Sequence, residues 1–133
     1  MKIQFFLIAL FILFSVSLIC DVADSLKTIE VSPKITILEF GADNCYYCKK
    51  MKKILDEIKL EYGDSIRVEL IDFNNPQNHR IIKKYFIKEI PAQIFLDERG
   101  KEIHRHVGFY PEEKIDEFLK EQGLKIISIQ KKK

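Results

Sequence analysis

Cysteine is scarce in this chain of 133 residues, which has three cysteines in all. Cys20 ends an apolar N-terminal run, so the rest of the chain holds only Cys45 and Cys48. A structural disulfide framework usually needs more cysteines at wider spacing, and a pair three residues apart closes a loop too small to stabilise the fold much. A zinc site would need two further ligands, and there is no second cysteine pair. The pair is therefore better suited to thiol chemistry.

The sequence also lacks a marked excess of either charge. It has 22 basic and 20 acidic residues, a formal net charge of +2. Basic residues do not form a stripe interleaved with aromatic residues, and residues 131–133 are a short lysine tail. We therefore predict no nucleic-acid partner. The length suits one domain with a modest core, and we expect a monomer.

Residues 1–20 differ in composition from the rest. Lys2 is the one charged residue among them, and residues 3–19 are almost wholly apolar, which is typical of an export signal. Three outcomes remain open: cleavage near Ser17 or Cys20, retention of residues 3–19 as a membrane anchor, or lipid attachment at Cys20. Each of them predicts that residues 21–133 form an exported, periplasmic or extracytoplasmic domain. Disulfides persist in such compartments. An unexported protein is the remaining alternative.

The pattern of apolar residues predicts the order strand-helix-strand-helix-strand-strand-helix. Strands are predicted over residues 34–40, 65–72, 92–97 and 102–107, with the last two joined as a hairpin. Helices are predicted from Cys45 to Gly63, from Asn75 to Phe86 and from Pro111 to Gly123. The early strands, joined through helices, should be parallel, and the hairpin adds antiparallel pairing. This predicts an α/β fold with a mixed sheet of about four to five strands and helices on both faces.

Apolar residues at spacings of three and four predict the buried face of each helix. In the first helix these residues are Tyr47, Met51, Ile54, Leu55, Ile58 and Tyr62. In the second they are Ile81, Ile82, Tyr85 and Phe86, and in the third Ile115, Phe118 and Leu119. Residues 29–31 are a candidate short strand, and residues 124–129 are either an edge strand or a tail.

The cysteine pair lies where a strand pattern ends and a helix pattern begins. With this element order, the run Phe40-Gly41-Ala42-Asp43-Asn44-Cys45-Tyr46-Tyr47-Cys48-Lys49 resembles the redox motif of the thioredoxin family. Ile90-Pro91-Ala92 is similar to the family segment in which the proline bond is cis, and Gly108 is similar to a late family glycine. The resemblance covers roughly residues 34–123. It implies a thioredoxin-like fold and thiol–disulfide oxidoreductase activity.

The sequence departs from the family pattern at several positions. Gly41 stands where an aromatic residue is usual, Asn44 stands where a tryptophan is usual, and the chain has no tryptophan at all. Glu39, six residues before Cys45, replaces the usual buried aspartate, and the second predicted strand has no lysine to partner it.

The resemblance implies a role for each cysteine. Cys45 should be the exposed nucleophile, because unpaired N–H groups and the dipole at a helix N-terminus favour its thiolate. Cys48, one turn along and more buried, should resolve the mixed disulfide. A cis bond at Pro91 would present backbone groups of Ile90 and Ala92 to an extended substrate.

Two further residue types bear on the site. If Glu39 is buried behind Cys48, its pKa is raised and it can exchange the proton that Cys48 gives or takes; the alternative is a strand-end glutamate that reaches solvent. Tyr46 is the better candidate for an exposed substrate contact, whereas Tyr47 fits the helix core.

Metal and cofactor chemistry is not expected. His104 and His106 share one face of a strand, but no third ligand accompanies them. We expect no metal and no cofactor beyond the redox-active cysteine pair.

The leading prediction is an exported thiol–disulfide oxidoreductase, most simply a disulfide reductase. Its substrates would be protein disulfides or dithiols, and a membrane partner would supply electrons. The alternative is a non-catalytic thioredoxin-like binding module whose cysteines form a static disulfide or hold a metal.

Overall fold

A single mixed sheet organises residues 33–127, which are the residues that the computed structural model describes. Its strand order is β2-β1-β3-β4. The strands are β1 (Ile35–Gly41), β2 (Ile66–Asp72), β3 (Ala92–Asp97) and β4 (Glu102–Val107). β1 pairs in parallel with β2 and antiparallel with β3, and β3 pairs antiparallel with β4. The expected mixed sheet is confirmed, and β1 lies inside it with a neighbour on each side.

Three α-helices and two short 3₁₀ turns accompany the strands within the described residues, and the last helix follows the last strand. The helices are α2 (Tyr46–Tyr62), α3 (His79–Lys84) and α4 (Glu112–Glu121), and the turns span Gly63–Ser65 and Pro76–Asn78. Gly63 ends α2 as predicted, with a φ of 54° and its N–H bonded to the Lys59 carbonyl. That φ is readily accessible to glycine because it has no Cβ.

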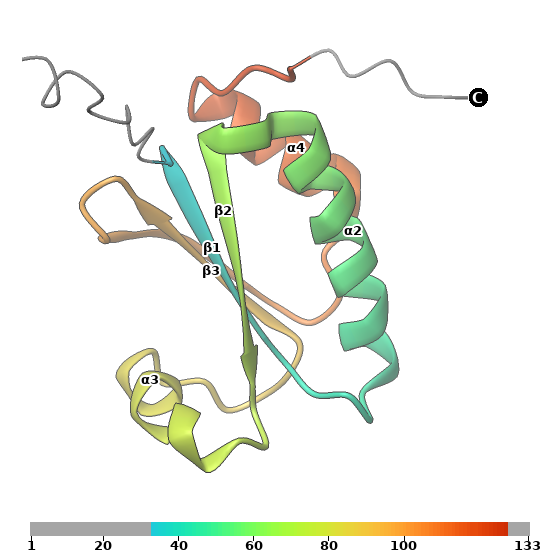
Figure 1. Ribbon diagram of the computed structural model, residues 1–133, viewed down its shortest axis with the longest axis vertical. Helices are drawn as coiled ribbons and strands as arrows, with labels where there is room; N and C mark the ends of the chain where they lie inside the picture. Colours follow the sequence, from blue (N-terminus) through green and yellow to red (C-terminus); the bar gives the residue numbers. More distant parts are fainter. Residues whose placement is uncertain (1–32, 128–133) are drawn as a thin grey trace, which may run out of the picture. The chain divides into compact units, whose positions relative to one another are not determined.

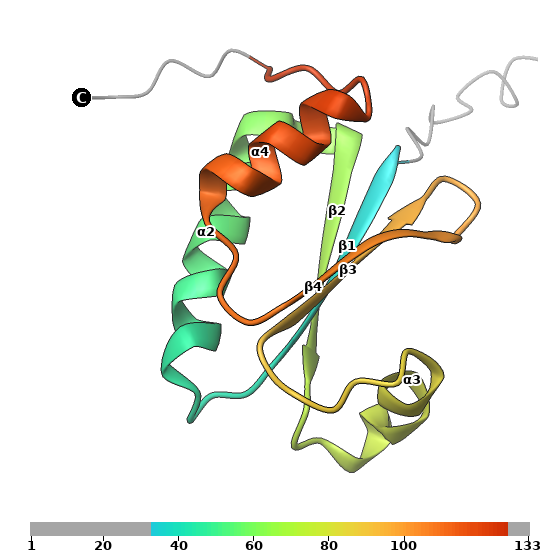
Figure 2. The ribbon, with the colours of Figure 1, turned by 180° about the vertical axis from the view of Figure 1, so that it is seen from behind.

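The helices cover both faces of the sheet, as Figures 1 and 2 show: α2 and α4 lie on one face and α3 on the other. Successive strand side chains point to opposite faces. In β1, Ile35 and Ile37 therefore pack with α2 and α4, whereas Leu38 and Phe40 pack with residues around α3. This alternation also places Glu39 on the face that α2 covers.

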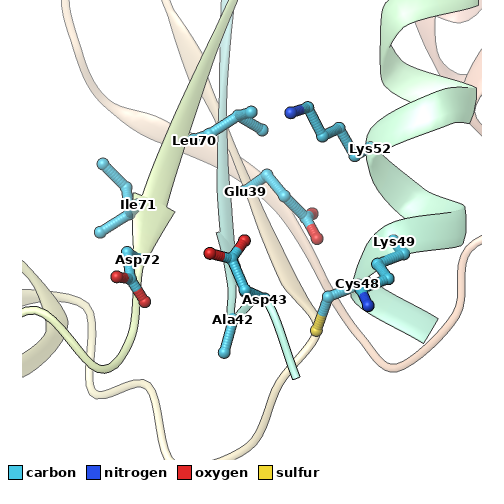
Figure 3. A pocket seen from close by; sticks show the side chains of 10 residues that line it. Glu39, Ala42, Asp43, Cys48, Lys49, Lys52, Leu70, Ile71 and Asp72 are labelled. Carbon is cyan, nitrogen blue, oxygen red and sulfur yellow. The ribbon is translucent and has the colours of Figure 1, made fainter. Parts of the chain in front are cut away.

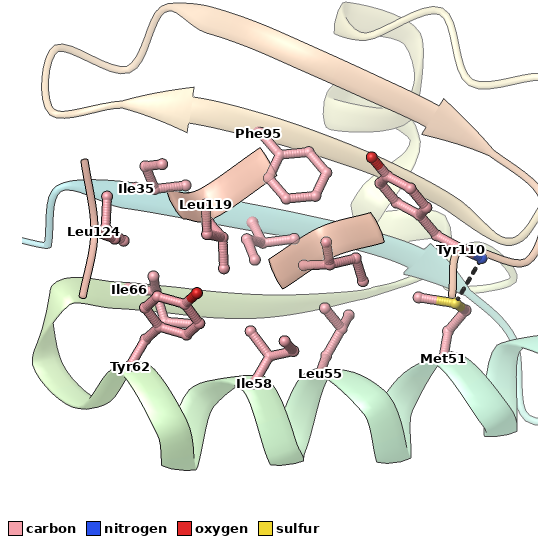
Figure 4. Packing of buried hydrophobic residues seen from close by; sticks show 12 residues of the cluster. Ile35, Met51, Leu55, Ile58, Tyr62, Ile66, Phe95, Tyr110, Leu119 and Leu124 are labelled. Atoms are coloured by element: carbon pink, nitrogen blue, oxygen red, sulfur yellow. Dashed lines mark hydrogen bonds between the residues drawn. The ribbon is translucent and has the colours of Figure 1, made fainter. Parts of the chain in front are cut away.

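The larger core lies between the sheet and the helices α2 and α4 (Figure 4). Its fully buried side chains include Phe95 of β3, Leu55 of α2 and Leu119 of α4. Burying a side chain of this size contributes about 1.5–3 kcal/mol relative to leaving it exposed. Polar links add to the core: the Tyr110 N–H donates to Met51 Sδ over 3.2 Å, and the Tyr62 hydroxyl donates to the Asp116 carboxylate.

Several sequence predictions need correction. β3 follows a helix, yet it runs antiparallel to β1, so only the first strand pair is parallel among the described strands. Tyr47 is 54% exposed instead of buried, because it lies in the first turn of α2, beyond the end of the core. Phe86 is 77% exposed, because the chain leaves α3 at Tyr85 and Phe86 takes a φ of +54°.

The segment after α4 is not a strand over residues 124–127. A hydrogen bond nevertheless joins it to α2, since the Ile127 N–H donates to the Glu61 carbonyl over 2.7 Å. The predicted leader (residues 1–20), the candidate strand at 29–31 and residues 128–133 lie outside the described residues. Within residues 33–127, no helix is long and apolar enough to cross a membrane.

Candidate active site

The cysteines lie at the junction between β1 and α2. After Gly41 the chain makes a tight turn in which the Cys45 N–H bonds the Ala42 carbonyl over 3.1 Å. Cys45 then caps α2 in an extended conformation, and its sulfur accepts a hydrogen bond of 3.1 Å from the Cys48 N–H. A sulfur at this position meets free helix N–H groups, which stabilise a thiolate. The predicted helix-start position of Cys45 is confirmed.

Cys45 and Cys48 form a disulfide with an S–S distance of 2.12 Å and a Cα–Cα distance of 5.2 Å. The two residues differ in exposure. Cys45 is half-buried, whereas Cys48 is only 6% exposed. An incoming substrate therefore reaches Cys45 more easily than Cys48.

Pro91 lies at the same end of the sheet as the cysteines. Phe40, close to the end of β1, pairs with Ala92, the first residue of β3. Pro91 therefore lies at the end of the sheet where the chain leaves β1 and turns toward Cys45. The Ile90–Pro91 peptide bond is cis, and the Pro91 carbonyl accepts a hydrogen bond of 2.7 Å from the Gly108 N–H. Ile90 is half-buried, while Ala92 is 1% exposed and paired on both sides in the sheet. Contact between these residues and a substrate stays a prediction.

Glu39 is buried, with 3% of its surface exposed. Burial disfavours the charged carboxylate and raises the pKa of Glu39 to about 8, against a smaller lowering effect of a hydrogen bond from Gln93. The expected buried position is confirmed, and it contradicts the alternative of a solvent-facing glutamate. A carboxyl with a pKa close to neutral pH can both take and give a proton.

Gln93 is the partner of Glu39 and was not predicted. It is fully buried and lies directly opposite Glu39 in the β1–β3 ladder. Its Nε2 donates to Glu39 Oε2 over 2.8 Å. Glu39 Oε1 and Gln93 Oε1 are both buried and have no hydrogen-bond partner. A sequence signal did exist, since a glutamine within the apolar strand AQIFLD requires a polar partner when it is buried.

A pocket of about 180 Å³ borders the buried carboxyl and Cys48 (Figure 3). The strands β1 and β2 and the start of α2 form its walls. Its lining residues are Glu39, Gly41, Ala42, Asp43, Cys48, Lys49, Lys52, Leu70, Ile71 and Asp72. Leu70 pairs with Glu39 in the β1–β2 ladder. Cys48 and Glu39 are thus brought together at one concave site that opens to solvent.

Aromatic side chains lie beside the disulfide on the outside of the molecule. Tyr46, Tyr47 and Phe109 are 65%, 54% and 40% exposed. The Tyr47 ring lies 5.3 Å from that of Tyr46 and 6.1 Å from that of Phe109, centroid to centroid. Tyr47 therefore belongs to an exposed aromatic cluster instead of the core, and Phe109 is a member that the sequence did not suggest.

The two histidines of β4 point toward the α4 side of the sheet. The His104 ring stacks on Phe118 with 4.6 Å between centroids, and its Nε2 lies 3.1 Å from the Tyr110 hydroxyl. His106 stacks on Tyr110 at 4.0 Å. Among residues 33–127, no group of three or more His, Cys, Asp or Glu residues is placed to hold a metal ion.

Comparison with known proteins agrees with this geometry. Residues 22–123 match the family described as thioredoxin-like domain. The chain is 29% identical to thioredoxin from Bacillus subtilis over 101 residues, which are 76% of this chain and 94% of that protein. It is 32% identical over 76 residues to the thiol:disulfide interchange protein TxlA homolog of Synechocystis, covering 57% of this chain and 42% of that protein.

Solved structures have the same fold. The germline-specific thioredoxin Deadhead from Drosophila melanogaster superposes with a TM-score of 0.60 at 21% identity, covering 68% of this chain and 83% of the other. A family match over most of the chain, a disulfide at the cap of α2 and a mixed sheet with helices on both faces lead to one conclusion. The chain belongs to the thioredoxin-like family of thiol–disulfide oxidoreductases.

Proposed function

We propose that this protein is an exported protein-disulfide reductase that works through Cys45 and Cys48. The observation that carries the proposal is the unequal setting of the two sulfurs. Cys45 is the accessible sulfur at the helix cap, and Cys48 is buried beside a carboxyl whose pKa is close to neutral. This division suits an attacking thiolate and a resolving thiol.

The reaction needs no external cofactor. The Cys45 thiolate attacks one sulfur of a substrate disulfide, which forms a mixed disulfide and releases the first substrate thiolate. Cys48 gives its proton to Glu39, and the Cys48 thiolate attacks Cys45 Sγ, which releases the second substrate thiolate. The substrate gains two electrons, both substrate thiolates take protons from water, and the protein is left with the Cys45–Cys48 disulfide.

Tyr46, Tyr47 and Phe109 supply the substrate surface in this proposal, together with backbone groups near Ile90 and Ala92. Exposed aromatic side chains offer a large contact area at a small cost in conformational entropy. Protein substrates with an apolar segment next to the disulfide fit such a surface.

A membrane-bound dithiol protein is proposed as the electron donor. It would reduce the Cys45–Cys48 disulfide after each turnover. The support is the apolar composition of residues 3–19, which indicates export or membrane attachment, and the printed name of the Synechocystis relative, a thiol:disulfide interchange protein.

Insulin reduction by dithiothreitol, with and without the protein, tests the activity. We expect faster insulin precipitation with the wild type and no acceleration with Cys45→Ser, whereas the control Cys20→Ser keeps full activity. Metal analysis of the same samples tests the alternative of a binding module. Stoichiometric bound metal without turnover would overturn the proposal.

A further inference from the structure

Phe86 occupies a backbone position that favours glycine. It follows the end of α3 with a φ of +54°. Its N–H donates to the Lys83 carbonyl over 3.2 Å, and the Ile87 N–H donates to the Ile82 carbonyl over 3.0 Å, which is the bond pattern of a helix that ends in a left-handed residue. Glycine is usual at this position, because the Cβ of other residues is strained there. Folding alone therefore does not account for a phenylalanine at position 86.

The Phe86 side chain also gains little from burial, since 77% of its surface is exposed. Tyr85 and Ile87, on either side of it, are buried in the core that lies around α3. Arg105 Nη1 of β4 donates to the Tyr85 carbonyl over 3.1 Å. The turn is thus held in place by its neighbours, and it presents the Phe86 ring to solvent.

Basic side chains surround this turn. Arg80, Lys83 and Lys84, at spacings of three and four, share the exposed face of α3, and Lys88 lies two residues after Phe86. Every ion pair found among residues 33–127 lies within β4 or α4, so none of these four cations has an acidic partner there. Like charges at this spacing destabilise a helix. We call these four residues and Phe86 the α3 patch.

The helix dipole explains part of this composition. Cations in the last turn of a helix are stabilised by its free carbonyl groups, and this suits Lys83 and Lys84. The dipole does not explain Arg80 in the first turn, Lys88 beyond the helix or the exposed ring of Phe86. A binding role explains all five residues together.

An exposed aromatic ring among cations fits an anionic lipid surface, because the ring enters the interface while the cations bind the headgroups. Each Lys or Arg near such a surface strengthens binding about fivefold. We propose that the α3 patch docks this domain onto an anionic membrane. The apolar composition of residues 3–19 favours a membrane over an acidic protein as the partner, because it predicts export or attachment at a membrane.

Docking through the α3 patch does not use the face of the sheet on which α2 lies. α3 covers the opposite face, and α2 begins at the disulfide (Figures 1 and 2). The inference goes beyond the proposed reductase activity and does not depend on it, since lipid binding requires no thiol.

A single tryptophan can report on lipid contact, because the chain has none of its own. Phe86→Trp places it in the α3 patch, and the control Leu60→Trp places it at an exposed apolar position on α2. The full chain of each variant is mixed with vesicles of brominated phosphatidylcholine, with or without an equal part of brominated phosphatidylglycerol. Bromine quenches tryptophan fluorescence on contact.

The emission of Phe86→Trp should fall by about half or more with the anionic vesicles, but by less than about a fifth with the neutral ones. The emission of Leu60→Trp should be the same with both. Equal quenching of Phe86→Trp by the two lipid compositions, or no quenching by either, would overturn the proposal.

A charge reversal tests the cations. Lys83→Glu with Lys84→Glu, in the Phe86→Trp chain, should remove most of the quenching by anionic vesicles. The matched control is Lys53→Glu with Lys59→Glu on α2, which changes the net charge equally and should keep the quenching. Equal losses in both would show that net charge acts without the patch. A shift of the Phe86→Trp emission by polyglutamate, without quenching by vesicles, would assign the patch to an acidic protein and refute membrane docking.

Phe86→Gly tests whether the ring serves the fold. Glycine adopts a positive φ freely, so the urea midpoint of this variant should not fall below that of the wild type. A clearly lower midpoint would mean that Phe86 is kept for stability, and the argument for docking would fail. If the wild type does not accelerate insulin reduction, the proposed function is wrong, whereas the vesicle measurements still decide the role of the α3 patch.

Discussion

Gln93 and Glu39 are direct cross-strand partners, and the Gln93 amide donates to the Glu39 carboxyl over 2.8 Å. Both residues are buried, so the amide is the main protein group that stabilises the charged form of Glu39. The hydrogen bond lowers the pKa that burial raises. The acid–base behaviour of the site therefore depends on a pair of residues that are 54 positions apart in the sequence.

Gln93→Leu should raise the pKa of Glu39 above its wild-type value of about 8, because the carboxylate loses its amide donor. Loss of a hydrogen bond to a buried charge costs roughly 1–3 kcal/mol, so we also expect lower stability above the wild-type pKa. Carbon-13 NMR titration and urea unfolding measure the two effects. The exposed Gln122→Leu serves as the control, and an unchanged Glu39 titration in Gln93→Leu would contradict the pairing.

Glu39 should make stability depend on pH. Its folded pKa of about 8 lies above the ordinary value of 4.5 for a glutamate, so the folded protein holds this proton more tightly than the unfolded chain. The stabilising contribution is complete below pH 4.5 and is lost as pH rises through 8. The free energy of unfolding should fall by up to about 1.4 kcal/mol per pH unit in that window.

Glu39→Gln should remove this slope and make the protein more stable than wild type at pH 9. Urea unfolding of the oxidised protein at several pH values is the measurement. The same substitution should slow resolution of the mixed disulfide about tenfold or more near pH 7, since general acid–base assistance is lost. Thiol-exchange rates that match wild type across the pH range would reject the role of Glu39.

Cys48→Ser should trap substrates on Cys45. Without the resolving thiol the mixed disulfide persists, so non-reducing electrophoresis and mass spectrometry should reveal an adduct of protein and substrate. The reciprocal variant Cys45→Ser should yield little adduct, because Cys48 is only 6% exposed. Comparable trapping by both variants would argue against the assignment of Cys45 as the attacking sulfur.

The exposed aromatic cluster should determine substrate affinity. Tyr47→Ala and Phe109→Ala each remove one partner of a ring contact of 6.1 Å beside the cysteines. We expect KM for a protein disulfide to rise about three- to tenfold, while the rate with a small aliphatic disulfide stays the same. The control is Phe86→Ala, which removes another exposed aromatic side chain, outside this cluster. A matching KM increase in the control would mean that the cluster has no special role.

The Tyr62 hydroxyl should contribute to stability. It joins α2 to the Asp116 carboxylate of α4 while the ring is fully buried. Tyr62→Phe should lower the free energy of unfolding by about 1 kcal/mol, the usual contribution of one hydrogen bond. Chemical denaturation tests this, with Tyr47→Phe on the exposed start of α2 as the control. Equal stability of Tyr62→Phe and wild type would show that water replaces the bond fully.

Much of the fold could be predicted because local patterns and the final packing agree. The strands at residues 92–97 and 102–107 were predicted with the bounds that the structure has. Gly63 ends α2 as expected, since the next residues break the helical spacing. Such features depend on neighbouring residues along the chain, and a sequence displays those neighbours directly.

The errors concern relationships that are not local. Tyr47 has the spacing of a buried helix residue, but it lies in the first turn of α2, where Cys48 is buried and the Tyr47 side chain stays exposed. Phe86 follows Tyr85 in an apolar run, yet its left-handed backbone turns it outward. The direction of β3 depends on how the chain returns after α3, and helical periodicity carries no information about that path.

The candidate site was predicted in part. The positions of Cys45 and Cys48 and the burial of Glu39 followed from spacing and from the family resemblance. Gln93 and Phe109 were missed because the importance of Gln93 comes from register across strands and that of Phe109 from its contact with the first turn of α2. A search of the apolar strands for pairs of polar residues would have found Glu39 and Gln93.

Glu39 and the approach to both cysteines are carried by β1, an interior strand flanked by β2 and β3. Amide hydrogens of such a strand should exchange with solvent more slowly than those of the edge strands β2 and β4. Mutations in β2 and β4 should therefore disturb the framework that holds the redox pair less than mutations in β1.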